Sequence, residues 1–389
     1  MKTANNILIF ILLAFLTGCG GGRQSADDLI MVDVSKNYPE KELIVQDFFE
    51  VEYVVLETTD DFLTQGFVSA IGKEYILGKN RINDGDIFVF DRNGKGIRKI
   101  NRKGQGGEEY TYSTEIVLDE NNNEMFILDN PARKILVYDL FGNFKRSFKN
   151  VDSCFYSYTF NYDRDHLICY KYYSPGETNK PPCHLIISKQ DGSIALEIKI
   201  PYKEFKTHVW IERGIANGEY LIANSYFHQI IPYMGNWALV EASSDTIYTY
   251  SPDGALNPFI VRTPSIYSMD PEVFLFPCIL TDRYYFMRTN KKIFDAEKMR
   301  GFPGADLVYD KQENTLFDYS MYNGDFSEKK YVSMGSKPVN HEIAIYQSLE
   351  AYQLVEAYEK GELKGRLKEI AATLDAEDNP VIMLVKHKK

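Results

Sequence analysis

The sequence lacks an excess of basic residues and has no basic cluster. Lys and Arg number 44 against 55 Asp and Glu, which gives a formal charge of −11 at pH 7. Nucleic acids and anionic lipid surfaces attract proteins mainly through Lys and Arg. The composition therefore predicts no nucleic-acid partner, and any contact with a membrane would have to come from an attached lipid.

Cysteine is scarce, and its spacing excludes two common site types. The chain has five cysteines and no C-x-x-C pair, so zinc-ribbon and thioredoxin-like sites are excluded. Cys154, Cys169 and Cys183 fall in one region, and an exported protein could oxidise them. These three and Cys278 nevertheless lie in apolar or aromatic runs, where a cysteine usually packs as a small hydrophobic residue. We therefore favour four free, buried thiols.

Catalytic and metal-binding motifs are also missing. There is no Gly-x-Ser-x-Gly elbow, and the six histidines show no H-x-x-x-H spacing. Gly104–Gly107 could pass for a phosphate loop, but no helix start with Lys-Ser/Thr follows it. We interpret it as a crossing between two sheets. The sequence predicts no catalytic residue, no metal ligand and no resident cofactor.

The N-terminus carries the clearest targeting signal. Lys2 precedes the apolar run Ile7–Phe15, which is well short of the ~20 residues that span a bilayer. Leu16-Thr17-Gly18-Cys19 follows and resembles the lipobox of bacterial lipoproteins, in which cleavage precedes the cysteine and its thiol is acylated. We predict a signal peptide over residues 1–18, lipid attachment at Cys19, and a flexible tether over 19–28.

A repeated turn gives the fold. Five segments combine four apolar or aromatic positions with an acidic turn, and Gly94, Gly142, Gly192 and Gly254 end four of them at steps of 48, 50 and 62 residues. Asp, Asn and Gly supply hairpin geometry that other residues resist. The five hairpins are expected at Ile87–Gly94, Ile135–Gly142, Leu185–Gly192, Ile247–Gly254 and Leu307–Asn314.

Units of this length hold four strands and indicate an all-β propeller. Five hairpins are visible, so the chain ends are expected to form a sixth blade from Glu42–Val45, Val51–Leu56 and Val381–Lys386. This pairing would leave the ring without an open end. The six-bladed propeller would span residues 29–389, with a helical segment over about Val339–Leu374 packed on it.

The chain resembles the six-bladed, NHL-like propeller lipoproteins of Bacteroidetes. The resemblance rests on the lipobox, on Val55–Thr59, on Phe90–Gly94 with Gly104–Tyr110, and on Glu377–Pro380. The family commonly has Gly-Gln-Gly-Pro-Gly-Glu-Tyr at the third segment, and this chain departs from it at Gly107 and Glu108. The resemblance implies the fold and a location in the cell envelope, either periplasmic or surface-facing, and it implies no activity.

Two long insertions are candidates for the binding face. Tyr172–Pro182 expands one loop, and Asn224–Trp237 expands another, with Tyr226, Tyr233 and Trp237 as the predicted ligand-binding side chains. The alternative is that these aromatics cover blade edges. Asp245-Thr246-Ile247 resembles a Bacteroidetes O-glycosylation acceptor, which makes Thr246 a candidate modification site.

Two functions remain open. The first is a monomeric binding or scaffold propeller, held at a membrane by its lipid, that recognises a glycan, peptide or protein partner. The second is a calcium-dependent hydrolase or lactonase, because carboxylates converging on a ring axis would suit calcium. Since the sequence contains no pattern of nucleophile and base, we favour binding.

Replacing the lipobox cysteine tests the anchor. Cys19→Ala is expected to abolish acylation and release the protein from membranes, because buried methylenes of an acyl chain each contribute about 0.8 kcal/mol. Lipid labelling and membrane fractionation of cells would measure this. Unchanged fractionation with the label retained would contradict the prediction.

Overall fold

The acidic turn that recurs in the sequence joins the two outer strands of five sheets. The carboxylate of Asp91 accepts hydrogen bonds from backbone N–H groups two and four residues later, at 2.8 and 2.9 Å, and Gly94 has φ of 87°. Asp139 and Gly142 repeat this arrangement, with φ of 86° at the glycine. This left-handed conformation favours glycine. All five predicted hairpins are confirmed.

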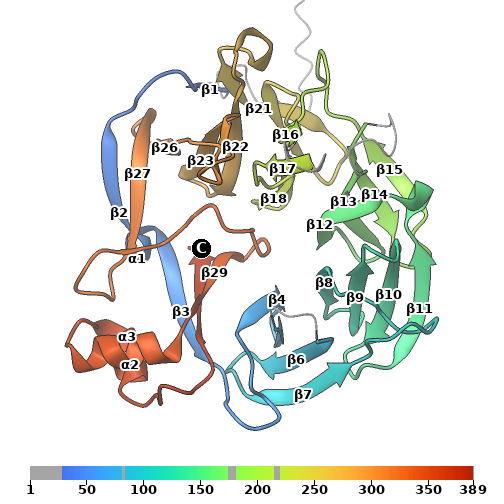
Figure 1. Cartoon of the computed structure of the whole chain (residues 1–389), viewed down its shortest axis with the longest axis vertical. Helices are drawn as coiled ribbons and strands as arrows, with labels where there is room; N and C mark the ends of the chain where they lie inside the picture. Colours follow the sequence, from blue (N-terminus) through green and yellow to red (C-terminus); the bar gives the residue numbers. More distant parts are fainter. Residues whose placement is uncertain (1–28, 81–83, 174–180, 214–219, 389) are drawn as a thin grey trace, which may run out of the picture.

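The computed structural model describes residues 29–80, 84–173, 181–213 and 220–388, in which six sheets stand around an axis (Figure 1). No helix within these ranges is long and apolar enough to cross a membrane. From the axis outwards, the strands are β4 (Phe67–Ile71), β5 (Tyr75–Lys79), β6 (Asp86–Asp91) and β7 (Gly96–Asn101) in blade 1; β8 (Glu115–Asp119), β9 (Glu124–Asp129), β10 (Lys134–Asp139) and β11 (Phe144–Lys149) in blade 2; β12 (Phe155–Asn161), β13 (His166–Tyr172), β14 (Cys183–Ser188) and β15 (Ile194–Ile198) in blade 3; β18 (Ile230–Tyr233), β19 (Asn236–Leu239), β20 (Thr246–Tyr250) and β21 (Leu256–Thr263) in blade 4; β22 (Val273–Leu280), β23 (Tyr284–Lys291), β26 (Asp306–Asp310) and β27 (Thr315–Asn323) in blade 5; and β29 (Ile343–Leu349), β30 (Val381–His387) and β3 (Phe49–Val55) in blade 6.

The two ends of the chain close the ring, as predicted. β3 pairs with β30 in antiparallel register from Phe49 opposite His387 to Val55 opposite Val381. β30 pairs with β29 along its other edge, so it is the middle strand of blade 6. Its residues from Val381 to Val385 are fully buried. The closing blade is therefore held from both sides by hydrogen bonds and apolar packing.

One predicted strand belongs to a different blade. Residues 42–45 were expected in blade 6, but β2 (Glu40–Ile44) lies parallel to β27 as an extra outer strand of blade 5. β1 (Ile30–Asp33) is added in the same way to β21 of blade 4. The reason is burial, because Val32 and Leu43 are 0% and 3% exposed in the apolar clusters beside these blades. The short helix α1 (Val45–Phe48) then leads the chain into β3.

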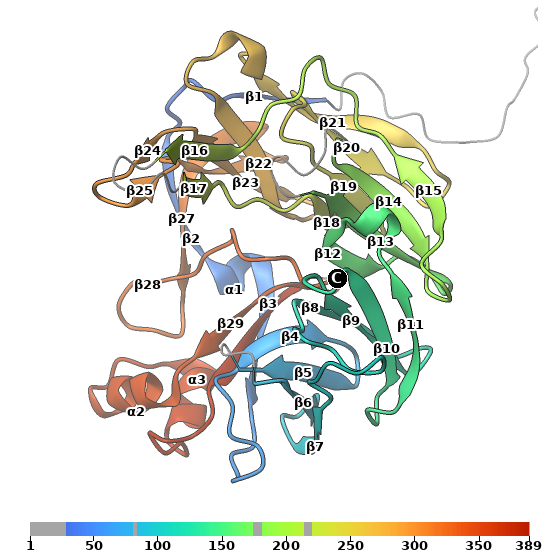
Figure 2. The same cartoon turned by 45° about the vertical axis from the view of Figure 1, so that its right-hand side comes forward.

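The two faces of the ring differ in their connections. On one face, here called the short-turn face, strands are joined by tight turns such as those after β4, β6, β8 and β10. The opposite, long-loop face carries the β-hairpins of β16 (Val209–Arg213) with β17 (Tyr220–Asn224) and of β24 (Phe294–Asp295) with β25 (Arg300–Gly301). Figure 2 shows these hairpins from a second direction. Most of the insertion expected at 172–182 lies outside the described residues.

The helical segment is shorter than predicted. A helix was expected from about 339, but residues 343–349 form β29, and only α2 (Ala351–Glu359) and α3 (Gly365–Ala371) are helical. Ile343 and Ile345 are β-branched and pair with β30, so blade formation decides the structure of this stretch. The break predicted between the helices is confirmed, with φ of 73° at Gly361 and 53° at Gly365.

Apolar clusters fill each gap between neighbouring blades. The largest joins α2 and α3 to blades 5 and 6 through Leu354 and Leu367, which are 2% and 0% exposed. The four cysteines beyond the tether are free and buried, as predicted, and three of them belong to the cluster between blades 2 and 3. Because each cluster needs side chains from two blades, a blade is stable only between its neighbours.

Truncation before Val381 tests the closure. Removing residues 381–389 deletes a strand that is paired on both edges, and several side chains worth about 2–5 kcal/mol each lose their burial. We expect aggregation or a fall in Tm of roughly 10 °C or more. Circular dichroism melting would measure it, with removal of residues 388–389 as the control. Equal melting of the two truncated chains would show that β30 is dispensable.

Candidate functional site

The closing blade has no regular strand next to the axis. β29 runs antiparallel to β4, and the hydroxyl groups of Tyr346 and Ser348 donate to the backbone oxygens of Val68 and Gly66, at 2.8 and 2.5 Å. The place of an innermost strand is taken by residues 332–342, here called the axial segment. It follows β28 (Lys330–Tyr331) and reaches the centre of the ring before β29 (Figure 1).

Three polar contacts hold the axial segment. The Lys337 ammonium forms an ion pair with Glu115 of β8, and the Asn340 side chain donates to the backbone oxygen of Ile71, at 3.0 Å. The His228 Nε2 lies 3.0 Å from the backbone oxygen of Gly335, to which it donates. Burial lowers the pKa of His228 to about 4, so the imidazole is neutral at pH 7. The segment therefore contacts blades 1, 2 and 4 at once.

A cavity of about 600 Å³ lies beside the axial segment. Its walls come from the innermost strands β4, β8 and β12, from Trp237 of β19, and from the axial segment itself. The innermost strands of blades 1 and 3 carry β-bulges at Ser69 and at Tyr158–Thr159. Tyr158 has φ of 50°, a strained conformation for a residue with a side chain. Bulges often re-aim side chains toward functional sites.

The bulged strands leave polar atoms without partners. Ser69 Oγ, Thr159 Oγ1 and Asn161 Oδ1 are buried, line the axial cavity, and make no hydrogen bond in the described structure. Thr159 is 3% exposed, so bulk water does not satisfy its hydroxyl group. A buried, unpaired hydroxyl or amide costs about 1–3 kcal/mol. A ligand or an ordered water that bonds these atoms would recover this energy.

The charged groups of the axial cavity are already paired. Lys189 forms an ion pair with Asp119 at 2.6 Å, and their side chains are only 6% and 4% exposed. Lys79 donates to the backbone oxygen of Ser113 at 2.8 Å, and burial lowers the pKa of its ammonium group. The cavity thus combines neutralised charges with unpaired neutral polar atoms.

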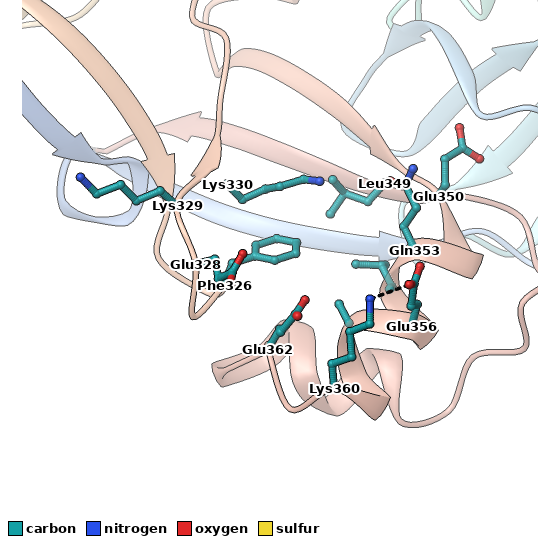
Figure 3. Close-up of a pocket in the computed structure, with 12 residues that line it drawn as sticks. Phe326, Glu328, Lys329, Lys330, Leu349, Glu350, Gln353, Glu356, Lys360 and Glu362 are labelled. Carbon is teal, nitrogen blue, oxygen red and sulfur yellow. Dashed lines mark hydrogen bonds and ion pairs between the residues drawn. The ribbon is translucent and has the colours of Figure 1, made fainter.

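Three other concavities lie elsewhere, and none of their lining residues holds a buried polar atom without a partner. One, of about 320 Å³, separates α2 from the chain around Phe326 (Figure 3). Charged side chains surround it, and Lys360 pairs with Glu356 within α2. A second, of about 900 Å³, lies beneath the N-terminal strands between blades 4 and 5. The unsatisfied atoms single out the axial cavity.

The three predicted ligand-binding aromatics lie in different surroundings. Tyr226 is 82% exposed on the long-loop face. Tyr233 is half-buried in the cleft between blades 4 and 5, where its hydroxyl lies 2.8 Å from that of Tyr285. Trp237 is 3% exposed and lines the axial cavity, with its ring 4.7 Å from that of His341. The structure therefore does not bring them together on one surface.

The remaining predicted sites are placed as follows. Thr246 begins β20 and is half-buried, while the neighbouring Asp245 accepts hydrogen bonds from Ser265 and from the backbone of Ile266, at 2.5 and 2.7 Å. Cys19 lies outside the described residues. Within the described ranges, no three His, Cys, Asp or Glu side chains gather closely enough to hold a metal ion. Glycosylation of Thr246 stays a prediction.

Sequence reasoning missed the residues that form the cavity. A bulge shifts the register by one residue and leaves no mark in the alternation of apolar side chains, so Ser69 and Thr159 read as ordinary strand positions. The axial segment does carry a signal. Gly335-Ser336-Lys337-Pro338 consists of turn-forming and loop-forming residues and stands directly before a strand.

The sequence matches the family DUF5128, described as a 6-bladed beta-propeller, over residues 22–346. The chain belongs to this propeller family. A Bacteroides fragilis protein described as exported, a likeness within the same architecture, is 18% identical with a TM-score of 0.58 over 93% of this chain and 99% of its own. No protein of curated function matches the sequence.

Other solved propellers are more distant. A member of the DUF4221 family from Bacteroides vulgatus is 11% identical, with a TM-score of 0.38 over 87% of this chain and 98% of its own. The virginiamycin B lyase of Staphylococcus aureus is also 11% identical, with a TM-score of 0.31 over 63% of this chain and 85% of its own. Scores this low support no functional argument, so the axial cavity of this propeller has to be interpreted from its own residues.

Two aromatic substitutions separate core from surface. Trp237→Ala is expected to reduce the free energy of unfolding by about 3–5 kcal/mol, because it empties a packed position beside Phe160. Tyr226→Ala is expected to change it by less than about 0.5 kcal/mol, because its side chain faces solvent. Urea denaturation measures both values. A similar loss in the two variants would contradict this assignment.

Proposed function

We propose that this protein is an exported, lipid-anchored propeller that binds a neutral, hydroxyl-rich ligand in its axial cavity. The ligand would have the size and chemistry of a small glycan. The observation that carries the proposal is the set of buried, unpaired polar atoms of Ser69, Thr159 and Asn161 in that cavity. Its volume of about 600 Å³ falls within the usual range for small-molecule sites.

The surroundings favour a neutral ligand over a charged one. Lys337 and Lys189 are engaged by Glu115 and Asp119, so an ionic ligand would have to break a partly buried ion pair to gain its own. Hydroxyl groups both donate and accept hydrogen bonds, which suits the hydroxyls and the amide oxygen that lack partners. The apolar face of a sugar ring would pack on aromatic side chains such as Trp237.

Two observations support location in the cell envelope. The lipobox at Leu16–Cys19 predicts acylation, and the Bacteroides fragilis relative is described as an exported protein. The predicted tether of residues 19–28 would hold the propeller close to the bilayer, since an extended chain spans at most ~3.3–3.6 Å per residue. The ligand would then be met outside the cytoplasm.

The alternative, a calcium-dependent hydrolase or lactonase, has less support. Such an enzyme needs axial carboxylates that are free to ligate an ion or to accept a proton. Glu115 instead pairs with Lys337 and accepts from the backbone N–H of Thr159 at 3.3 Å. Asp119 pairs with the buried Lys189. A calcium ion would have to displace both lysines.

Calorimetric titration of the full-length protein with sugars tests the proposal. The probes would be neutral mono- and disaccharides, compared with uronic acids and amino sugars of the same size. We expect a neutral sugar to bind and Thr159→Val to weaken its binding about 3- to 10-fold, which corresponds to the loss of one neutral hydrogen bond.

Thr249→Val is the matched control. Thr249 is a buried threonine of β20 that does not line the axial cavity, so its replacement should leave the affinity unchanged. Charged sugars that bind as well as neutral ones, or equal effects of the two valine variants, would refute the proposed ligand chemistry. If neither class of sugar binds, the proposal fails as a whole.

A further inference from the structure

The outermost strands of the propeller are protected in two ways. On blades 4 and 5 the edge is covered by β1 and β2, whose Val32 and Leu43 are buried beside the neighbouring blade. On blades 1 and 2 the outermost strands carry cationic side chains, Arg98 and Lys99 in β7 and the lysines of β11. Covering and charging an edge both prevent unwanted strand pairing.

β15, the outermost strand of blade 3, has neither protection. Ile194 and Leu196 are 39% and 43% exposed, and Ala195 and Glu197 are also exposed. Glu197 is the one charged residue of the strand, and its carboxylate pairs with Lys199, just beyond the strand, at 3.5 Å. Figure 1 places β15 on the outer rim, and no described strand pairs with its outer edge.

The exposed side chains continue an apolar cluster outwards. Leu196 lies opposite Ile186 of β14, and Ile186 packs in the cluster between blades 3 and 4. In the next two gaps around the ring, Val32 and Leu43 of the added strands close the outer end of the equivalent cluster. Between blades 3 and 4 this closing strand is missing, and apolar side chains remain in solvent.

We propose that β15 pairs with β15 of a second copy of this chain, in antiparallel orientation about a twofold axis through Ala195. In this register Ile194 of each copy stands opposite Leu196 of the other, so both exposed apolar side chains gain a partner. The flanking charges also match, because the same register brings Asp191 of each copy toward Lys199 of the other. A twofold contact of this kind is self-complementary, as a closed dimer requires.

The contact is small, and anchoring compensates for that. A short edge strand buries far less than the ~1,200 Å² of a stable interface, so the dimer would be weak in dilute solution. Attachment to one membrane confines the copies and raises their effective concentration. The proposal therefore concerns the membrane-bound protein, and it requires no ligand in the axial cavity.

Disulfide trapping in membranes tests the pairing. The full-length Ala195→Cys variant would be expressed in cells, its membranes treated with a mild oxidant, and the products separated on a non-reducing gel. Side chains directly opposite on antiparallel strands have Cβ atoms about 4.5–5.5 Å apart, close enough for a disulfide after a small adjustment. We expect a reducible dimer at several-fold higher yield than in a control without this geometry.

Ser147→Cys is that control, because Ser147 is an exposed residue of β11 on the charged edge of blade 2. Adding Leu196→Lys to Ala195→Cys should remove the trapped dimer, since it places a charge in the apolar contact. Thermal melting of each variant would confirm that the ring is intact. Equal trapping at residues 147 and 195, or a dimer that survives Leu196→Lys, would overturn the proposal.

Discussion

Antiparallel pairing between β3 and β30 is the interaction on which the rest of this propeller depends. It joins residues from opposite ends of the sequence, Phe49 with His387 and Val55 with Val381. Each apolar cluster is shared by two blades, so an open ring would leave the first and last blades with an unburied face. The axial cavity depends on closure as well, because its walls come from blades 1 to 3 and from the axial segment of the closing blade. Pairing across such a sequence distance also makes folding slow, since the last strand must be available before the ring can form.

The sequence predicts those parts of the structure that local chemistry determines. Asp91 with Gly94 and Asp139 with Gly142 fix two hairpins by side-chain hydrogen bonds and by a left-handed glycine, and these features are visible in the sequence. The closing strands were also predictable, because a ring needs its ends joined. Residues 343–349 were assigned to a helix because the apolar spacing of the following helices was extended too far towards the N-terminus. The cavity could not be predicted, because the bulges at Ser69 and Thr159 depend on how three innermost strands meet at the axis.

The axial segment links the irregular part of the fold to its chemistry. A regular strand beside β29 would have hydrogen-bonded along its whole length and filled the axis. The segment instead uses side chains, namely Lys337 toward Glu115 and Asn340 toward Ile71. The space beside it is lined by the polar atoms that the bulged strands leave unpaired. Irregular backbone next to unsatisfied polar groups is costly, and natural proteins retain such features mainly at functional sites.

The added strands β1 and β2 have a mechanical consequence for an anchored protein. A pull on the N-terminus would load β1 first, because it precedes every other paired strand, and would reach β2 only after β1 had detached from blade 4. The strand that closes the ring, β3, comes third in this series. Moderate tension from the membrane would therefore be absorbed by two sacrificial strands on the rim, while the ring and its cavity stay intact. On release, each strand would find its open edge again, so the two act as a resettable strain relief.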